Sequence, residues 1–297
     1  MTPALHPIIP YFEQPSLRLG PVTIHAFGVI VAISVLLGLA LTRRRFARLG
    51  LDPTIGNGLV GYALVAGFVG AHLFALLLYM PHEVAANPLK IFKVWEDISS
   101  FGGILGGALG TALYLKLRAG PLTSNQRLAY FDALAFVFPL ALTVGRLACT
   151  VAHDHPGTVT RFPFAISLSS DAARAYITAI YERAGRLAEL PAPSALSLMG
   201  FHDLGWYEFL FLALLVAPLV LIADRRPRHT GFFVRLFLLL YLPTRFLLDF
   251  LRVGDARYLG LTPAQHVAVA GILVLTVREI WRRQRTRRVS AVLPEAP

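Results

Sequence analysis

Residues 244 to 261 read TRFLLDFLRVGDARYLGL, and they come two residues after GFFVRLFLLLY (231–241), a run apolar enough for the interior of a bilayer. The stretch nevertheless carries Arg245, Asp249 and Arg252, whose i, i+4 and i+7 spacing places them on one face of a helix. Ionisable groups inside the hydrocarbon are costly and usually face a cavity or a partner. Asp249 can neutralise one arginine but not two, so the pattern predicts a cation that needs a further anion.

The composition of the whole chain is that of a membrane protein. Hydrophobic residues make up 56% of the 297 residues and charged residues 15%, whereas a soluble domain is about 25% charged. The formal net charge is +11, but the basic residues stand in short clusters between apolar runs. That arrangement is typical of membrane topology and not of a nucleic-acid groove, so we expect no nucleic-acid partner.

Seven apolar segments have a length suited to crossing a bilayer as helices, which takes about 17–25 residues. They are residues 22–42, 56–79, 101–117, 128–152, 206–223, 231–251 and 261–281. The sequence therefore predicts an all-α polytopic membrane protein with about seven transmembrane helices, forming a single transmembrane domain over residues 1–297.

Arginine clusters follow every second predicted span. They are Arg43, Arg44, Arg45 and Arg48; Arg118 and Arg127; Arg225, Arg226 and Arg228; and Arg282, Arg283, Arg285, Arg287 and Arg288. The positive-inside rule makes these loops cytoplasmic, so the N-terminus is expected outside and the C-terminus in the cytoplasm. Residues 153–205 then form a small extracytoplasmic cap between spans four and five. Within the cap, SDAARAYITAIYERAGRLAEL (170–190) favours an amphipathic helix.

A second intramembrane charge lies in FPLALTVGRLACTVAHDHPG, residues 138–157. Arg146 sits deep in span four, and a guanidinium suits phosphate because it donates two parallel hydrogen bonds. Arg146 with Arg245 or Arg252 would form a clamp for a lipid phosphate. A metal site is one interpretation of the residues near the outer end of the span, His153, Asp154 and His155. However, the His-x-His pattern supplies only two ligands, and no further ligand is apparent nearby. A surface turn or an acid/base role is favoured, and we expect no metal.

Two further segments contribute candidates at the outer ends of the spans. SSFGGILGGALG (99–110) includes Gly102 and Gly103, which indicate close helix packing or, alternatively, exposed backbone beside a lipid headgroup. GPVTIHAFG (20–28) puts His25 at the outer start of span one. We expect these groups and the arginines to line a cavity that opens to the outer leaflet. Cys149 is the sole cysteine, so the chain has no intramolecular disulfide and no four-cysteine metal site.

Five segments, in this order, resemble the bacterial prolipoprotein diacylglyceryl transferases. They are LGPVTIHAFG (19–28), NPLKIFKVWEDISSFGGILGG (87–107), GRLACTVAHDHPG (145–157), WYEFL (206–210) and TRFLLDFLRVGDARYLGLTPAQ (244–265). The last segment is the most specific, and the resemblance is weakest over 158–200. Seven spans with the N-terminus outside is also the architecture of that family.

The resemblance implies a reaction and its partners. Members transfer an sn-1,2-diacylglyceryl group from phosphatidylglycerol to the lipobox cysteine thiol at the signal-peptide end of a prolipoprotein, forming a thioether and releasing glycerol phosphate. No cofactor is implied, and the location implied is the bacterial cytoplasmic (inner) membrane, which the protein crosses several times. The matching positions assign phosphate binding to Arg146 and Arg245. Substrate binding is assigned to Arg252, Asp249, Gly102, Gly103, Tyr207 and Glu208.

The chain departs from the family pattern at the position of a proton acceptor. Where the family has His before Gly-Gly, this chain has Phe101, which cannot take a proton. His153 or His155, with Asp154 beside them, could act as the base from the outer surface, and His25 is a third candidate. A thiol with an ordinary pKa near 8.5 is also partly thiolate unaided.

The same residues leave two other functions open. A protein of this fold could bind an anionic phospholipid without this reaction, or act on another acceptor. A transporter could use the arginines for an anion path, although the chain has no internal repeat. Replacing Phe101 with His would discriminate the transferase from the binding protein.

Overall fold

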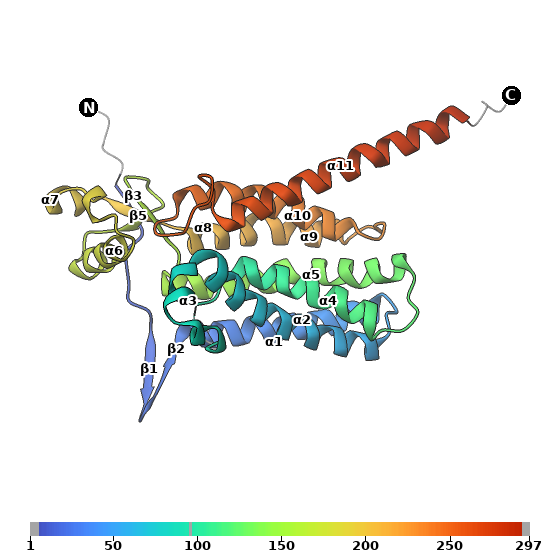
Figure 1. The fold of residues 1–297 in the computed structure, drawn as a ribbon, viewed down its shortest axis with the longest axis horizontal. Coiled ribbons are helices and arrows are strands. Elements are labelled where there is room, and N and C mark those ends of the chain that lie inside the picture. The colour runs from blue at the N-terminus through green and yellow to red at the C-terminus, as the bar shows by residue number, and fades with distance from the viewer. Residues whose placement is uncertain (1–5, 95–96, 293–297) are drawn as a thin grey trace.

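A computed structural model describes residues 6–94 and 97–292 as a bundle of long helices with a smaller folded segment at one end (Figure 1). The helices run side by side along the long axis of the molecule. The described start of the chain lies at the end that carries the small segment, and the last helix runs to the opposite end. The predicted cluster Arg282, Arg283, Arg285, Arg287 and Arg288 falls on side chains outside the described ones.

Each of the seven predicted spans overlaps a helical stretch, although the first span was predicted to begin at residue 22, which lies in the strand β2 (Val22–His25), and the sixth runs three residues past the end of its α-helix. The stretches are α1 (Ala26–Arg48), α2 (Pro53–Phe74) continued by the π-helix η1 (Ala75–Tyr79), α4 (Ser100–Leu117), α5 (Ser124–Ala152), α8 (Leu204–Phe211) continued by the π-helix η4 (Leu212–Val216) and α9 (Ala217–Ala223), α10 (Phe232–Leu248), and α11 (Pro263–Val292). The short helices α3 (Pro81–Ala86) and η2 (Pro88–Phe92) join the second stretch to the third. Successive long stretches run in opposite directions, as a chain that crosses a layer repeatedly must.

Five of these stretches are long and apolar enough to cross a membrane. They are Ala26–Arg48, Pro53–Tyr79, Ser124–Ala152, Leu204–Ala223 and Pro263–Trp281. The remaining two, α4 and α10, have 18 and 17 residues. A helix satisfies its own backbone hydrogen bonds, which is the condition for residence in hydrocarbon. The chain is thus a mostly helical, polytopic membrane protein.

Side-chain caps fix where several helices begin. Asp52 accepts a hydrogen bond of 2.7 Å from the Thr54 amide at the start of α2. Thr123 and Gln126 form a capping box at the start of α5. Asp203 accepts from the Trp206 amide (3.1 Å) and starts α8. α5 ends at His153, whose left-handed backbone (φ 51°) turns the chain out of the helix.

Glycines bring α2 and α4 into close contact. A Cβ added at Gly70 would lie 2.8 Å from the Cα of Gly106, and one at Gly106 would overlap the carbonyl oxygen of Ala66. Gly102 faces Phe74 and the backbone of Gly70 in the same way. Small residues allow helices in a membrane to approach this closely. The packing interpretation of the glycine segment is therefore the one that the structure supports.

The segment between α5 and α8 contains strands that the all-α prediction did not include. β3 (Pro156–Thr160), β5 (Gly200–Asp203) and β4 (Ile166–Ser167) form an antiparallel sheet in that order. The helices α6 (Asp171–Arg183), η3 (Leu187–Glu189) and α7 (Pro193–Leu196) complete the segment. α6 is the expected amphipathic helix, and it buries Ile177 and Tyr181 against Phe201 of the sheet.

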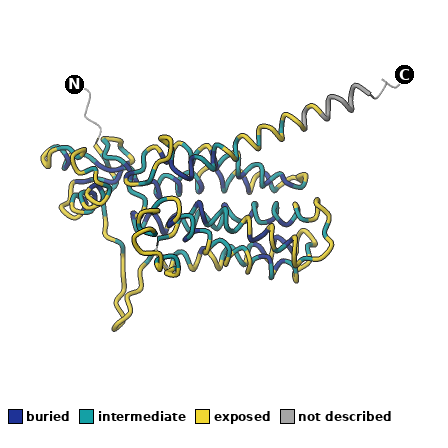
Figure 2. Tube along the Cα trace, viewed as in Figure 1, coloured by how far each residue is buried: buried dark blue, intermediate teal, exposed yellow. Residues whose placement is uncertain are grey.

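A second pair of strands precedes α1. β1 (Ser16–Leu19) pairs with β2 (Val22–His25) as an antiparallel hairpin in which Ser16 lies opposite His25. The hairpin projects away from the bundle and is exposed along its length (Figure 2). Burial elsewhere follows the facing sides of the helices and the interior of the sheet segment.

Candidate functional site

A buried ion cluster joins three long helices near the end that carries the sheet segment. Arg146 of α5 places its Nη2 atom 2.6 Å from Oε2 of Glu208 in α8. Arg245 of α10 places its Nη1 atom 3.4 Å from the other oxygen, Oε1, of the same carboxylate. The three residues are at most 3% exposed. Two cations that are 99 positions apart in the sequence thus meet at one anion.

The cluster continues along the predicted helical face of α10. Nη2 of Arg245 lies 3.0 Å from Oδ1 of Asp249, and Oδ2 of Asp249 accepts a hydrogen bond of 2.6 Å from Thr262. Thr262 and Gln265 in turn cap the start of α11. The motif TRFLLDFLRVGDARYLGLTPAQ therefore links two helices through its own polar groups.

The predicted unpaired cation is not present in this structure. The prediction concerned Arg245 and Arg252, and both have anionic partners: Arg245 pairs with Asp249 and Glu208, and Arg252 pairs with Asp255. The prediction was wrong because it counted Asp249 as the sole carboxylate and omitted both Asp255, three residues after Arg252, and Glu208, which comes from α8. Breaking a buried pair of this kind leaves an uncompensated charge, which is strongly destabilising.

Arg252 lies apart from the cluster, contrary to the shared helical face that was predicted. α10 ends at Leu248, and the 3-10 helix η5 (Asp249–Leu251) leads to an extended Arg252. Its Nε atom pairs with Asp255 at 2.6 Å, and its backbone pairs with Gly157 of the sheet segment. It lines a cavity of about 430 Å³. The early end of the helix removes Arg252 from the face that Arg245 and Asp249 share.

Each guanidinium of the cluster has one N–H group that makes no hydrogen bond with another described residue. Among the described residues, the Nε atoms of Arg146 and Arg245 are buried and have no hydrogen-bond partner. Buried polar groups are normally satisfied, and an orphaned donor marks a place for a ligand or water. The side chains are enclosed by their neighbours, so the expected open cavity around both arginines is not confirmed.

Tyr241 is a cluster member that the sequence analysis missed. Its hydroxyl donates to Oε1 of Glu208 (3.1 Å) and accepts from Nη2 of Arg146 (3.5 Å). Tyr241, Arg245 and Asp249 follow one another at intervals of four, which is the spacing of one helical face. That spacing was the signal that could have found it.

His153 forms a buried pair at the end of α5. Its Nδ1 atom lies 2.6 Å from Oδ2 of Asp203, and its ring stacks on Tyr11 at 5.1 Å between centroids. The backbone carbonyl of His153 accepts a hydrogen bond from the Tyr176 hydroxyl. These contacts join the chain start, α6 and the sheet. The structure thus gives His153 a position at the junction of the bundle and the sheet segment.

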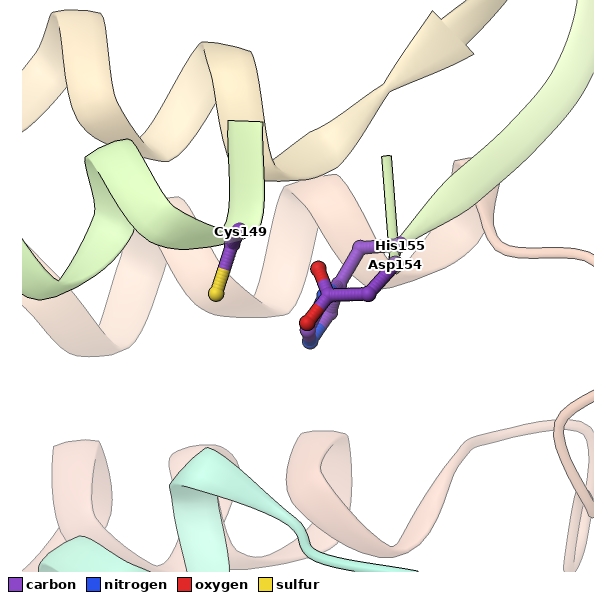
Figure 3. A group of neighbouring side chains, drawn as sticks. All are labelled: Cys149, Asp154 and His155. Atoms are coloured by element: carbon purple, nitrogen blue, oxygen red, sulfur yellow. The ribbon is translucent and has the colours of Figure 1, made fainter. Parts of the chain in front are cut away.

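Cys149, Asp154 and His155 form a second polar group beside the ion cluster. Their ligand-type atoms all lie within 4.8 Å of one another, and Figure 3 shows the three side chains directed to the same side. Nη1 of Arg146 reaches the sulfur of Cys149 at 3.5 Å, which connects the group to the ion cluster. The sequence pattern did not identify Cys149 as a partner, because a single cysteine within span four was considered only for a disulfide or a four-cysteine site.

The Asp154 carboxylate and the His155 imidazole are hydrogen-bonded to each other. Burial acts to lower the pKa of His155, but the adjacent Asp154 carboxylate outweighs it and raises that pKa to about 9. Burial acts to raise the pKa of Asp154, and the charge of His155 outweighs it, so the pKa of Asp154 is lowered. At neutral pH the two form an ion pair.

Three other predicted site residues take no part in the ion cluster. His25 is exposed at the end of the β1–β2 hairpin. The hydroxyl of Tyr207 lies 2.9 Å from Nδ1 of His202 in the sheet segment. Gly103 faces Ala71 of α2, where an added Cβ would make an ordinary contact of 3.6 Å. With Gly102, it belongs to the helix contact described above.

Phe101 occupies the apolar side of the cluster. It is 3% exposed and packs in one core with Phe237, Tyr241 and Leu242 of α10. The position where the sequence resemblance led us to expect a histidine is therefore filled by an apolar ring in the same core as Tyr241, the residue that hydrogen-bonds to Glu208.

Comparison with known proteins shows the family of the chain. The family described as prolipoprotein diacylglyceryl transferase matches residues 15–281. A phosphatidylglycerol–prolipoprotein diacylglyceryl transferase from Chromohalobacter salexigens is 28% identical over 285 residues, 93% of this chain and 94% of that protein. A protein of the same name from Xanthomonas campestris pv. campestris (strain B100) is 31% identical, over 85% of this chain and 82% of that protein. Another from Symbiobacterium thermophilum is 26% identical, over 94% of this chain and 96% of that protein. The chain belongs to the prolipoprotein diacylglyceryl transferase family.

Proposed function

We propose that this protein transfers the sn-1,2-diacylglyceryl group of phosphatidylglycerol to the cysteine thiol of a prolipoprotein. The acceptor is the lipobox cysteine next to the signal peptide, which enters the site from the bilayer. The observation that carries the proposal is the meeting of Arg146 and Arg245 at Glu208 in a chain of this family.

The reaction forms one bond and breaks one. The acceptor sulfur bonds to the glyceryl carbon, the bond from that carbon to the phosphate oxygen breaks, and glycerol phosphate leaves with the bonding electron pair. The thiol proton is released to water. Negative charge grows on the phosphate oxygen as the bond breaks, so fixed cations around it lower the barrier.

The arginine cluster has the donors that this phosphate requires. The Nε atoms of Arg146 and Arg245 are buried without partners among the described residues. A lipid phosphate that accepts from these donors can share the two guanidinium groups with Glu208. The planar fork of arginine also fixes the orientation of the phosphate. We assign phosphate binding to Arg146 and Arg245, and place Arg252 at the cavity beside the sheet segment as a contact for the rest of the lipid head.

We further propose that all seven helical stretches cross the bacterial cytoplasmic (inner) membrane. α4 is packed backbone to backbone on α2, and α10 packs on α11, so each short helix lies alongside one that is long enough to span. The arginine clusters in the last turns of α1, between α4 and the start of α5, and after α9 lie at the end away from the sheet segment. The positive-inside rule makes that end cytoplasmic. Residues 153–205 then form an extracytoplasmic cap, and the N-terminus is outside.

A direct assay tests the transferase function. Purified full-length protein in detergent or vesicles receives phosphatidylglycerol and a peptide with a lipobox cysteine. We expect a thioether-linked lipopeptide, detected by mass spectrometry, together with released glycerol phosphate. A peptide with serine in place of the lipobox cysteine is the matched control and should give neither product.

The same assay decides between transfer and lipid binding alone. If the protein binds phosphatidylglycerol vesicles but yields no lipopeptide under any of these conditions, the transferase proposal is refuted and a binding function replaces it.

A further inference from the structure

We propose that Cys149, Asp154 and His155 form a binding site for a divalent transition metal ion of the Zn²⁺ class, beside the phosphate-binding arginines. The three supply a thiolate sulfur, a carboxylate oxygen and an imidazole nitrogen, which are the ligand types that zinc takes in proteins. Their ligand atoms lie within 4.8 Å of one another. Neighbouring ligands of a tetrahedral zinc ion are about 3.4 Å apart, so small side-chain rotations would bring all three to one ion.

The local backbone explains why these residues gather. Cys149 lies in the last turn of α5, and the helix ends at His153 in a left-handed conformation. That turn folds Asp154 and His155 back beside the helix end, so their side chains point to the same side as the sulfur (Figure 3). Two adjacent residues and one from the preceding turn thereby converge without any long-range contact.

The charges around the group favour a divalent cation. Arg146 and Arg245 are matched by Glu208 and Asp249 in the ion cluster. A metal ion takes histidine as the neutral imidazole, so binding would displace the proton of His155 to water. Cys149 as a thiolate and Asp154 as a carboxylate then leave two negative charges, which a divalent ion neutralises. The guanidinium of Arg146 at 3.5 Å from the sulfur opposes a nearby cation. Glu208, which pairs with Arg146 at 2.6 Å, offsets that repulsion.

The position of the group suggests what the ion would do. Three protein ligands leave a fourth tetrahedral position open, as in catalytic zinc sites. A thiol that binds there loses its proton to water, because a metal ion takes sulfur as thiolate. The open position would lie close to Arg146, where the lipid phosphate is expected. This catalytic role rests on the proposed transferase function, whereas the metal site itself does not.

The proposal also accounts for Phe101. This residue is buried in the same core as Phe237 and Leu242 and offers no proton acceptor where the sequence resemblance led us to expect a histidine. A metal ion that holds the acceptor sulfur as thiolate makes a base at that position unnecessary. The ion would therefore replace a side chain that this protein lacks.

Metal binding can be measured without any substrate. Full-length protein is stripped with a chelator, loaded with Zn²⁺ or Co²⁺, and freed of excess metal. We expect about one ion per chain by elemental analysis, and a charge-transfer band of a cobalt–thiolate bond in the near ultraviolet. The cobalt–thiolate band should be absent in Cys149→Ser. The affinity for Zn²⁺ should fall by more than about 100-fold in Cys149→Ser and in His155→Ala, which exceeds the loss expected when a residue only hydrogen-bonds to a metal ligand. His82→Ala, an exposed histidine of α3, is the matched control and should bind like the original protein.

Thermal unfolding distinguishes a variant that has lost the metal site from one that does not fold. Each variant is compared with and without Zn²⁺. The ion should raise the unfolding temperature of the original protein and of His82→Ala by the same amount, and should leave that of Cys149→Ser and His155→Ala unchanged. Asp154→Asn, which keeps the shape of the side chain, should show a smaller rise. If the stripped original protein takes up no Zn²⁺ or Co²⁺, or if the cobalt band persists in Cys149→Ser, the metal site is refuted.

The activity assay separates this inference from the function that it builds on. Stripped protein should lose transfer by at least about 100-fold and regain it with Zn²⁺, in line with the rate effects of fixed electrostatic groups. Transfer that is unchanged after the metal is removed would overturn the catalytic role of the ion while the transferase function stands. Metal binding with no transfer in any form would refute the transferase function while the site stands.

Discussion

Arg146 and Glu208 form the shortest ion pair of the buried cluster, with Nη2 of the arginine 2.6 Å from Oε2 of the carboxylate. The pair joins α5 to α8, and Arg245 approaches the other oxygen of Glu208 from α10. One carboxylate thus fixes the separation of two guanidinium groups on different helices. Its negative charge also offsets the cost of burying the two positively charged guanidinium groups.

Glu208→Gln should destabilise the protein strongly. The amide keeps the shape of the side chain but leaves two buried guanidinium groups with one carboxylate, Asp249, between them. We expect a loss of about 3–5 kcal/mol in the free energy of unfolding, measured by denaturant or thermal unfolding in detergent. Glu182→Gln, on the cap helix α6, is the control, and an equal effect of both changes would contradict the role of Glu208.

Arginine should not be replaceable by lysine in the cluster. Arg146→Ala and Arg245→Ala should each lower transfer by at least about 1,000-fold, because each removes a fixed cation from the phosphate. Arg146→Lys and Arg245→Lys should also impair transfer, by about 10- to 100-fold, since a point charge lacks the bidentate fork. The measurement is initial rate of lipopeptide formation in protein shown to be folded. Full activity in either alanine variant would remove that residue from phosphate binding.

Two neighbouring glycines should respond differently to the same change. A methyl group at Gly106 would overlap the carbonyl oxygen of Ala66, whereas one at Gly103 would make a 3.6 Å contact with the Cβ of Ala71. Gly106→Ala should therefore reduce the free energy of unfolding by about 1–3 kcal/mol, while Gly103→Ala stays close to the original protein. Thermal unfolding of the two variants side by side tests this. Equal stability would mean that α2 and α4 do not pack as closely as described.

Phe101→His should lower stability without raising activity. The imidazole would be buried among Phe237, Leu242 and other apolar groups, and an unsatisfied polar group in such a place costs about 1–3 kcal/mol. Phe101→Leu preserves the apolar surface and is the control. Because we assign thiol activation to the metal site, the rate of transfer should not rise. A large gain in rate would instead identify a latent catalytic position at residue 101.

The sheet segment should lose stability in mild acid through His202. Burial lowers the pKa of His202 below its ordinary value of 6.5, so the folded state disfavours the protonated ring. The unfolded chain then binds this proton at a higher pH than the folded chain, and the stabilisation is lost as pH falls from 6.5 through the folded pKa. The unfolding temperature of the original protein should drop more between about pH 7.5 and pH 5.5 than that of His202→Gln. Parallel pH profiles would contradict the assignment.

The sequence by itself determined the membrane character, the positions of the long helices and the residues that carry charge inside them. Hydropathy and helical spacing are local properties, so Arg146, Arg245 and Asp249 could be identified before any contact was known. The motif resemblance likewise depends only on order along the chain. The five longest apolar stretches and the helices α4 and α10 appear where the sequence predicted them.

Only the tertiary structure decided which charges meet. Glu208 neutralises two arginines because α5 packs on both α8 and α10 and brings their side chains together, a relationship that no local pattern contains. The end of α10 at Leu248 turns Arg252 away from the cluster, although its i, i+7 spacing suggested otherwise. Cys149 joins Asp154 and His155 because the left-handed His153 folds the chain back beside α5. Coulomb and ligand contacts act over a few ångströms of space, and the folded path of the helices sets those distances.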